Sequence, residues 1–456
     1  MRAVFTGIVL ALILVHYIEL IAGAAVLGWT QSLLAMAMFL VGILLTRQNQ
    51  RYYALAIMST GAIIFFLRPF TGTPLFDGFR QLNMMVGTLM LVPVLGVLFD
   101  LRGYVYALLG LATRYLKRPP FFLSALAVLS NLVSAMLLVG CLPLIYHLVE
   151  KVAEGDESGL RQRLLTVSIL QGCSSAGLWS PSWVLVAMSL SIGTRWQEIA
   201  LYGFLLAAVS ILVASAYLFF LARPLWHAPL LANGQEEETG VPPNRALEFL
   251  FLLVVFLAVV LLGDTYTDLG VINVVPLAAV ALTALGYTLT GNITELPGRA
   301  WKFLQGQIPR QSGILSLLMS TGFLSAALFS TGLGLDLFNA FLGLLDQFSI
   351  SILTGLPILI CLLGYVGIDP VLAVVLILPG LTAGMLADLP TYIISLALMA
   401  GGSASLSCAP FAASTMIMAG QVQSDPIRVG TCWNWPYSLA FLTLAILILN
   451  CLARFA

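Results

Sequence analysis

The chain has 456 residues, of which 60% are hydrophobic and only 9% are charged. So few charges exclude a soluble globular protein, because they could not cover a water-facing surface, whereas lipid replaces water around most of a membrane protein. The 20 Lys and Arg balance the 20 Asp and Glu, which gives no support for a nucleic-acid partner. We therefore expect an all-α polytopic membrane protein with the lipid bilayer as its surroundings.

Uninterrupted apolar runs recur from the N-terminus, and a run of about 20 residues is long enough to cross the hydrocarbon core of a bilayer. In the first half they predict spans at residues 3–19, 28–46, 52–67, 82–99 and 197–222, with an amphipathic piece at 103–116. The first run could also be a signal peptide, but His16 and Glu19 fit poorly in a signal-peptide core. We interpret it as the first span.

Two further runs in the first half are interrupted by polar or helix-breaking residues. Residues 119–150 contain Ser130-Asn131 and later Pro143, and residues 163–193 contain the stretches GCSSAG (172–177) and SPS (180–182). We interpret 119–150 as a re-entrant hairpin with its tip at Ser130-Asn131, and 163–193 as a broken transmembrane helix.

The second half repeats this order after a polar stretch at 223–245, which we interpret as a cytoplasmic linker. Spans are predicted at 246–263, 270–291, 312–332 and 432–452, with an amphipathic piece at 295–310. A re-entrant hairpin at 350–386 is interrupted by Gly364, Gly367 and Asp369-Pro370, and a broken helix at 389–421 is interrupted at 401–403 and 405–410. Residues 1–222 and 246–456 are thus predicted as two inverted repeats, with about 11 spans plus two hairpins.

The distribution of basic residues supports this layout. With the N-terminus in the cytoplasm, 16 of the 20 Lys and Arg fall on the cytoplasmic side, as the positive-inside rule requires. The first hairpin is flanked by basic residues and would enter from inside, whereas the second has none and would enter from outside. The sequence therefore predicts an integral protein of a bacterial inner membrane, with its C-terminus outside.

Breaks at corresponding positions of two halves indicate a transporter's binding site, because unpaired backbone groups survive at membrane depth only inside protein or beside water. Helix N-termini attract anions, and unwound carbonyl groups can coordinate Na⁺. The candidate substrate- or ion-binding residues are Ser130, Asn131, Ser134, Ser174, Ser175, Ser180, Gly367, Asp369, Ser403, Ser405, Ser407 and Thr415. The alternative is that the hydroxyl groups only cap helices and pack between them.

Asp369 is the one carboxylate in the four interrupted stretches apart from Glu150, the last residue of the first. An Asp-Pro pair is also a good N-cap and first-turn pair, so Asp369 either caps a helix alone or also handles a proton or a cation. The six cysteines form no CxxC or metal-ligand spacing, and three histidines are too few for a metal site. We expect no metal cofactor and, without an HExxH or GxSxG motif, no enzyme.

The stretch RPPFFLSALAVLSNLVSAMLLVGCLPLI (118–145) resembles the inward hairpin of the divalent anion:sodium symporter family, a branch of the ion transporter superfamily that also includes arsenite permeases and sodium/proton antiporters. Residues 166–190 resemble that family's broken fifth helix, and 312–332 and 354–420 resemble the second-half counterparts. The chain differs in carrying Leu132 in place of a threonine, Gly367-Ile368-Asp369-Pro370 at the second tip, and no Thr-Pro-Pro-Asn element after the first break.

The resemblance implies a homodimer with a static scaffold domain and a transport domain that moves as an elevator. It places Ser130 and Asn131 on a tip that binds Na⁺ and substrate. We therefore expect a symporter for a small organic anion, coupled to Na⁺ or H⁺. A proton-coupled exporter or a cation/proton antiporter of the same superfamily is the alternative, which Asp369 motivates.

Overall fold

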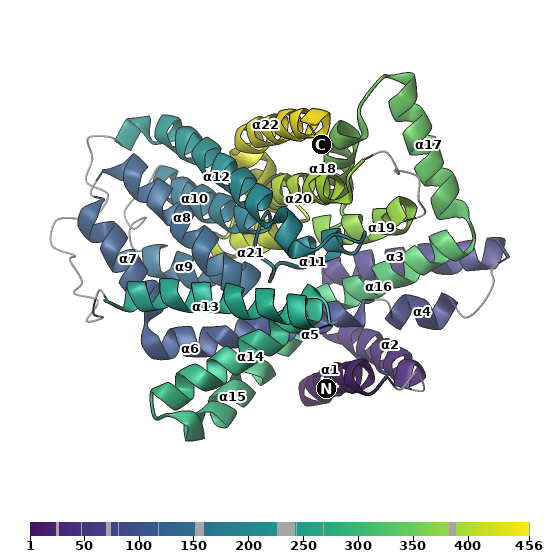
Figure 1. The fold of residues 1–456 in the computed structure, drawn as a ribbon, viewed down its shortest axis with the longest axis horizontal. Helices are drawn as coiled ribbons and strands as arrows, with labels where there is room; N and C mark the ends of the chain where they lie inside the picture. Colours follow the sequence, from purple (N-terminus) through teal and green to yellow (C-terminus); the bar gives the residue numbers. More distant parts are fainter. Residues whose placement is uncertain are drawn as a thin grey trace. The chain divides into compact units, whose positions relative to one another are not determined.

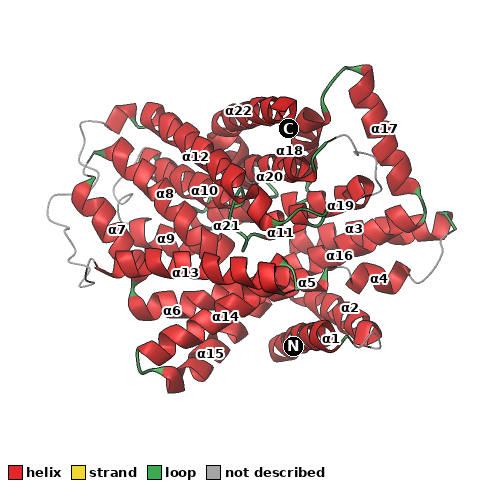
Figure 2. Ribbon diagram, viewed as in Figure 1, coloured by secondary structure: helices red, strands yellow, loops and turns green. Residues whose placement is uncertain are grey.

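The computed structural model of the chain describes residues 1–23, 27–46, 48–69, 74–80, 82–116, 118–150, 159–225, 242, 244–267, 269–382 and 389–455. These residues are mostly helical and contain no β-strand (Figure 2), which confirms the predicted all-α fold. Ten of their helices or helix pairs are long and apolar enough to cross a membrane. The predicted linker at 223–245 lies almost wholly outside the described residues.

The chain divides into two compact units, and each takes segments from both halves of the sequence (Figure 1). Unit 1 comprises Met1–Val97, Gly263–Ile352 and Leu372–Ala387, and unit 2 comprises Leu98–Leu262, Leu353–Val371 and Asp388–Ala456. The boundaries of the units therefore differ from those of the two predicted repeats.

Unit 1 is built from long apolar helices with few turns between them. It contains α1 (Arg2–Ala22), α2 (Leu27–Leu45), α3 (Gln48–Leu67), α4 (Pro74–Arg80), α5 (Asn83–Leu91), the 3-10 turn η1 (Val92–Val94), α14 (Val271–Leu289), the 3-10 turn η5 (Ile293–Glu295), α15 (Leu296–Arg310), α16 (Ser312–Ser330), α17 (Leu333–Gln347) and most of α19 (Pro370–Thr382). The sequence does not predict α17.

Small residues bring the helices of unit 1 close together, as is typical of helix packing in membranes. α16 packs against α2, α3 and α4. A Cβ atom at Gly78 would lie only 3.1 Å from the carbonyl oxygen of Gly322, and one at Gly61 would lie 2.8 Å from the ring of Phe323. The backbone of α16 can therefore approach both neighbours only because these positions carry no side chain.

Unit 2 holds all the interrupted stretches except most of α19. It contains most of α6 (Leu95–Arg102), α7 (Tyr104–Tyr115), α8 (Pro119–Leu137), the 3-10 turn η2 (Leu138–Gly140), α9 (Cys141–Val149), α10 (Leu160–Ala176), α11 (Val184–Leu190), α12 (Trp196–Leu221), the 3-10 turn η4 (Arg223–Leu225), most of α13 (Asn244–Tyr266), α18 (Ile352–Val366), α20 (Thr391–Cys408), α21 (Ala413–Gln421), the π-helical turn η6 (Arg428–Cys432) and α22 (Trp433–Phe455).

α10 and α20 form the core of unit 2. Every residue from Leu164 to Ala176 and every residue from Ile393 to Cys408 is buried. α8 and α12 pack against α10, and α12 and α22 pack against α20. Because protein rather than lipid surrounds α10 and α20, their polar side chains and the chain breaks that follow them can be tolerated at membrane depth.

The two predicted broken helices do break, and proline accounts for both sites. α10 ends at Ala176 and α11 begins at Val184, with Pro181 between them. α20 ends at Cys408, where the extended backbone of Ala409 (φ −73°, ψ 130°) suits the residue before Pro410. In the second predicted hairpin, α18 and α19 are separated by Gly367, whose φ of 108° requires glycine, and by Ile368-Asp369.

Several of the predicted interruptions are wrong in position. Residues 172–176 lie inside α10, and Gly364 lies inside α18. Ser130 and Asn131 lie inside the continuous helix α8, and the break in the first hairpin comes later, at Leu138 (φ 56°). Residues 401–407 are likewise helical within α20. Neither Ser130-Asn131 nor 401–407 contains a proline, and Asn131 and Ser403 form hydrogen bonds with the neighbouring helix α10.

Candidate substrate- and ion-binding site

The first break is held against the C-terminal end of α8. The indole Nε1 of Trp183 donates a hydrogen bond to the carbonyl oxygen of Ser134 (3.2 Å), and Ser180 Oγ donates to that of Ala135 (2.7 Å). These carbonyl groups belong to the last turn of α8, where helix carbonyls can accept from groups outside the helix; that of Ser134 also accepts from the Leu138 N–H. The predicted site residue Ser180 thus caps α8 at the first break.

Asn131 joins α8 to both sides of this break. Its Nδ2 donates to Ser175 Oγ (2.7 Å), and its Oδ1 accepts from Trp179 Nε1 (3.3 Å). Ser134, one turn further along α8, makes a contact of 3.2 Å with the thiol of Cys173. Both the nitrogen and the oxygen of the Asn131 amide therefore bond to protein side chains, and the Na⁺ ion expected near Ser130 and Asn131 stays a prediction.

Ser130 differs from its neighbour. Its side chain is fully buried, and its hydroxyl oxygen has no hydrogen-bond partner among the described residues. A Cβ atom at Gly172 on α10 would lie 2.8 Å from Ser130 Cβ and would collide with the carbonyl oxygen of Ala127. The absent side chain of Gly172 thus brings α8 and α10 together and places Ser130 against the backbone of α10.

At the second break, Asp369 caps two helices at once. One carboxylate oxygen accepts from the backbone N–H of Val371 in the first turn of α19 (3.0 Å), and the other accepts from that of Ala413 at the start of α21 (3.2 Å). The negative charge lies where both helix dipoles are positive, which is favourable. Asp369 therefore joins the second hairpin break to the second helix break. The sequence predicts its cap of α19 but not its hydrogen bond to α21.

α18 approaches α20 through a glycine near the same point. A Cβ atom at Gly364 would collide with the hydroxyl oxygen of Ser405 and would lie 3.0 Å from Ala409 Cβ. Ser405 is fully buried, and the structure gives its hydroxyl oxygen no hydrogen-bond partner within the described ranges. Ser130 and Ser405 are thus unpartnered buried hydroxyls beside the first and second breaks.

The two broken helices are joined directly. Ser403 Oγ on α20 donates to the carbonyl oxygen of Ser174 on α10 (2.8 Å). The other hydroxyls bond to backbone carbonyls of their own segment: Ser174 to Gln171, Ser175 to Gly172, Ser407 to Ala404 and Thr415 to Leu406. All twelve predicted site residues therefore belong to unit 2, and one hydrogen bond connects the group from the first half with the group from the second.

The polar residues of α22 and α12 that border this region are not among the twelve predicted site residues. Asn434, Tyr437 and Ser438 are buried on one face of α22, at positions i, i+3 and i+4. Asn434 accepts from Gln171 Nε2 (3.1 Å), and Tyr437 shares a hydrogen bond of 2.6 Å with Ser210 on α12. Three polar residues at helical spacing in an otherwise apolar span are a signal that could have revealed this face.

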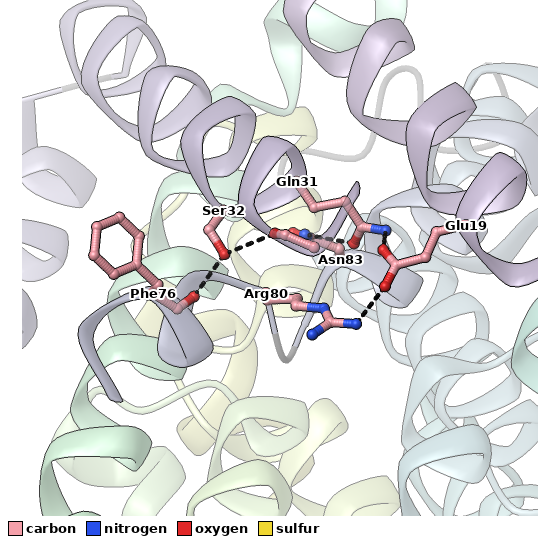
Figure 3. A network of polar contacts seen from close by, with 7 residues as sticks. Glu19, Gln31, Ser32, Phe76, Arg80 and Asn83 are labelled. Atoms are coloured by element: carbon pink, nitrogen blue, oxygen red, sulfur yellow. Dashed lines mark hydrogen bonds and ion pairs between the residues drawn. The ribbon is translucent and has the colours of Figure 1, made fainter. Parts of the chain in front are cut away.

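Unit 1 has a polar network of its own (Figure 3). The carboxylate of Glu19 on α1 pairs with Arg80 on α4 and accepts from Gln31 Nε2 on α2. The amide of Gln31 in turn accepts from Asn83 Nδ2 on α5 (3.2 Å). The network joins four helices of unit 1 and includes none of the twelve predicted site residues.

Comparisons with known proteins bear on the fold. No family model matches the sequence, and no curated protein matches it. Among solved structures, the chain is similar to the YdaH transporter of Alcanivorax borkumensis, whose crystal structure has an unusual topology, with a TM-score of 0.53 and 18% sequence identity over 89% of this chain and 98% of that chain. This chain shares its fold with a membrane transporter. Together with the ten apolar helices, the likeness identifies the chain as an integral membrane protein.

At 18% identity the likeness concerns the fold alone. The expected membership of the divalent anion:sodium symporter family, the inverted repeats and the homodimer stay predictions.

Proposed function

We propose that this protein is a secondary active transporter that moves a small organic anion across the membrane, coupled to Na⁺ or H⁺. The observation that carries the proposal is the pair of broken helices buried in unit 2 and joined from Ser403 to the Ser174 carbonyl. Helices broken at membrane depth leave backbone groups for a solute or ion, and burial in protein makes such breaks tolerable. The shared fold of a known transporter agrees with this function.

The same proposal covers the mode of movement. All twelve candidate residues lie in unit 2, so a solute bound among them would travel with that unit, as in an elevator mechanism. Unit 1 would then serve as the scaffold through which two copies of the chain form a homodimer. We place the protein in a bacterial inner membrane with its N-terminus in the cytoplasm.

Reconstitution in proteoliposomes tests the function directly. Transport currents would be recorded for a panel of carboxylates, sulfonates and oxyanions, each with a Na⁺ gradient, a pH gradient and neither. We expect saturable currents that require one of the gradients. Empty liposomes and the Ser189→Ala variant serve as controls, because the Ser189 hydroxyl bonds only within α11, to the Leu185 carbonyl. Transport indifferent to both gradients would contradict the proposal.

One observation favours the second candidate, a proton-coupled exporter or a cation/proton antiporter. The Asp369 carboxylate already occupies the backbone N–H groups at the second break that would otherwise attract an anion. An acid at this depth can exchange a proton for a cation. If the Asp369→Asn variant folds and retains full pH-dependent exchange, this candidate is excluded.

A further inference from the structure

Three buried helix faces of unit 2 meet in a cluster of uncharged oxygen atoms. α22 contributes Asn434 and Ser438, which bond to Gln171 on α10 (3.1 Å) and to Ser407 on α20 (2.9 Å). Tyr437 lies on the same face and within hydrogen-bonding reach of Ser174. None of these side chains carries a formal charge, and all are buried.

Hydrogen bonds fix the orientation of the Asn434 and Gln171 side-chain amides. Asn434 Nδ2 donates to the carbonyl oxygen of Val429 (2.8 Å), which turns Asn434 Oδ1 toward Gln171. Gln171 must then present its Nε2 to that oxygen, and its own Oε1 is left over. Gln171 is fully buried, and its Oε1 has no hydrogen-bond partner in the described part of the chain. A buried amide oxygen without a partner costs free energy unless something binds it.

The hydroxyl groups around Gln171 offer acceptors and no donors. Ser174 donates its proton to the Gln171 carbonyl (3.0 Å), and Ser403 donates to the Ser174 carbonyl (2.8 Å). A hydroxyl has one proton and two lone pairs, so both oxygens retain lone pairs after these bonds. Both hydroxyl protons are thus engaged within the protein, whereas the two hydroxyl oxygens and the unpartnered Gln171 Oε1 can each coordinate a cation.

The absence of charge selects the kind of cation. Divalent cations such as Ca²⁺ and Mg²⁺ are held in proteins by carboxylates, and this cluster contains none. A single positive charge needs less compensation, and neutral amide, hydroxyl and carbonyl oxygens can replace its hydration shell. Val429, which accepts the hydrogen bond from Asn434, lies in the π-helical turn η6. Such turns frequently occur at functional sites.

We propose that Gln171 Oε1, with the hydroxyl oxygens of Ser174 and Ser403, binds a monovalent cation, Na⁺. This site is distinct from the Asn131 amide, whose nitrogen and oxygen each already bond to a protein side chain. The inference rests on the proposed function, for which it names the place of the coupling ion. Asn434 is a positioning residue, since it holds the Gln171 amide with its oxygen toward the site.

Binding of radioactive Na⁺ to the purified full-length protein in detergent tests the site without any substrate. We expect saturable binding that Gln171→Leu weakens by about tenfold or more, the effect of losing one good ligand. Ser189→Ala, a buried hydroxyl elsewhere in unit 2, leaves binding unchanged. Gln171→Glu keeps an oxygen ligand and adds a negative charge, so we expect it to bind Na⁺ more tightly than the wild type.

The Gln171→Glu variant keeps the inference open to refutation if Gln171→Leu fails to fold. Unchanged Na⁺ affinity in the Gln171 variants that fold overturns the site, as does a wild type that binds no Na⁺ and holds only water there. If the wild type binds no Na⁺ but carries proton-driven currents, the inference fails while the proposed function stands. If Na⁺ binds through Gln171 but no solute is transported with either gradient, the site stands and the proposed function fails.

Discussion

The double cap formed by Asp369 allows a quantitative test. Asp369→Asn keeps the size of the side chain but replaces one acceptor oxygen with an NH₂ group, which cannot accept from either backbone N–H. Two hydrogen bonds to a charged acceptor, worth about 1.5–3 kcal/mol each, give way to at most one neutral bond worth about 1 kcal/mol. Because Asp369 is only half-buried, the lower part of this range applies, and we expect the variant to lose about 2–3 kcal/mol of stability.

A second variant removes one of these bonds from the other side. Ala413→Pro deletes the N–H that donates to Asp369 at the first position of α21, where proline is well accepted. The extended backbone of Ala412 (φ −63°, ψ 139°) already suits a residue before proline. We expect Ala413→Pro to lose about 1–2 kcal/mol, and the double variant to lose about 1 kcal/mol less than the sum of the two.

Thermal denaturation of the detergent-solubilised variants provides the measurement. The matched control is Asp425→Asn, which removes the charge from an exposed cap that accepts only from the Ile427 N–H (2.7 Å). Its effect is expected to be smaller, about 0.5–1 kcal/mol, and simply additive with Ala413→Pro. Strict additivity between Asp369→Asn and Ala413→Pro, or an Asp369→Asn variant as stable as the wild type, would refute the double cap.

Three further variants test the packing of each unit. Asn131→Ala leaves the buried indole N–H of Trp179 without its acceptor and should cost about 1–3 kcal/mol, with a change in tryptophan fluorescence; an unchanged spectrum contradicts the pairing. Gly172→Ala should separate α8 from α10 and cost about 1–3 kcal/mol in thermal denaturation, whereas Gly140→Ala, which has open space around it, should be neutral. Glu19→Leu leaves Gln31 Nε2 without its acceptor, so we expect the variant to lose about 1–3 kcal/mol of stability in thermal denaturation. We expect the same gradient to drive its transport as in the wild type. An altered gradient dependence would show that the network takes part in coupling.

The features predicted correctly from the sequence are those that depend on a few adjacent residues. Pro181 and Pro410 interrupt helices because of their own covalent structure, so both breaks can be located from the printed sequence. Asp369-Pro370 has the pattern of a helix start, and the structure has a helix beginning at Pro370. The apolar runs predict the helices for the same local reason.

The features that the sequence does not predict depend on distant partners. Ser130 and Asn131 suggest an interruption when α8 is considered alone, but Ser175 and Trp179, more than 40 positions away, keep Asn131 inside a helix. The second hydrogen bond of Asp369 reaches Ala413, 44 positions later, so its role in joining two breaks is not visible locally. The polar face of α22 likewise bonds to residues far away in the sequence, Gln171 on α10 and Ser407 on α20.

The burial of α10 also has consequences for how the protein is made. Its first turns contain Arg161 and Arg163 and its last turns are rich in polar residues, and it is not among the ten helices apolar enough to cross a membrane on their own. Such a segment is inserted poorly by hydrophobicity alone during synthesis. α8 precedes it and α12 follows it, and both are strongly apolar neighbours that pack against it. We therefore expect the insertion of α10 into the membrane to depend on α8 and α12, the apolar helices that pack against it.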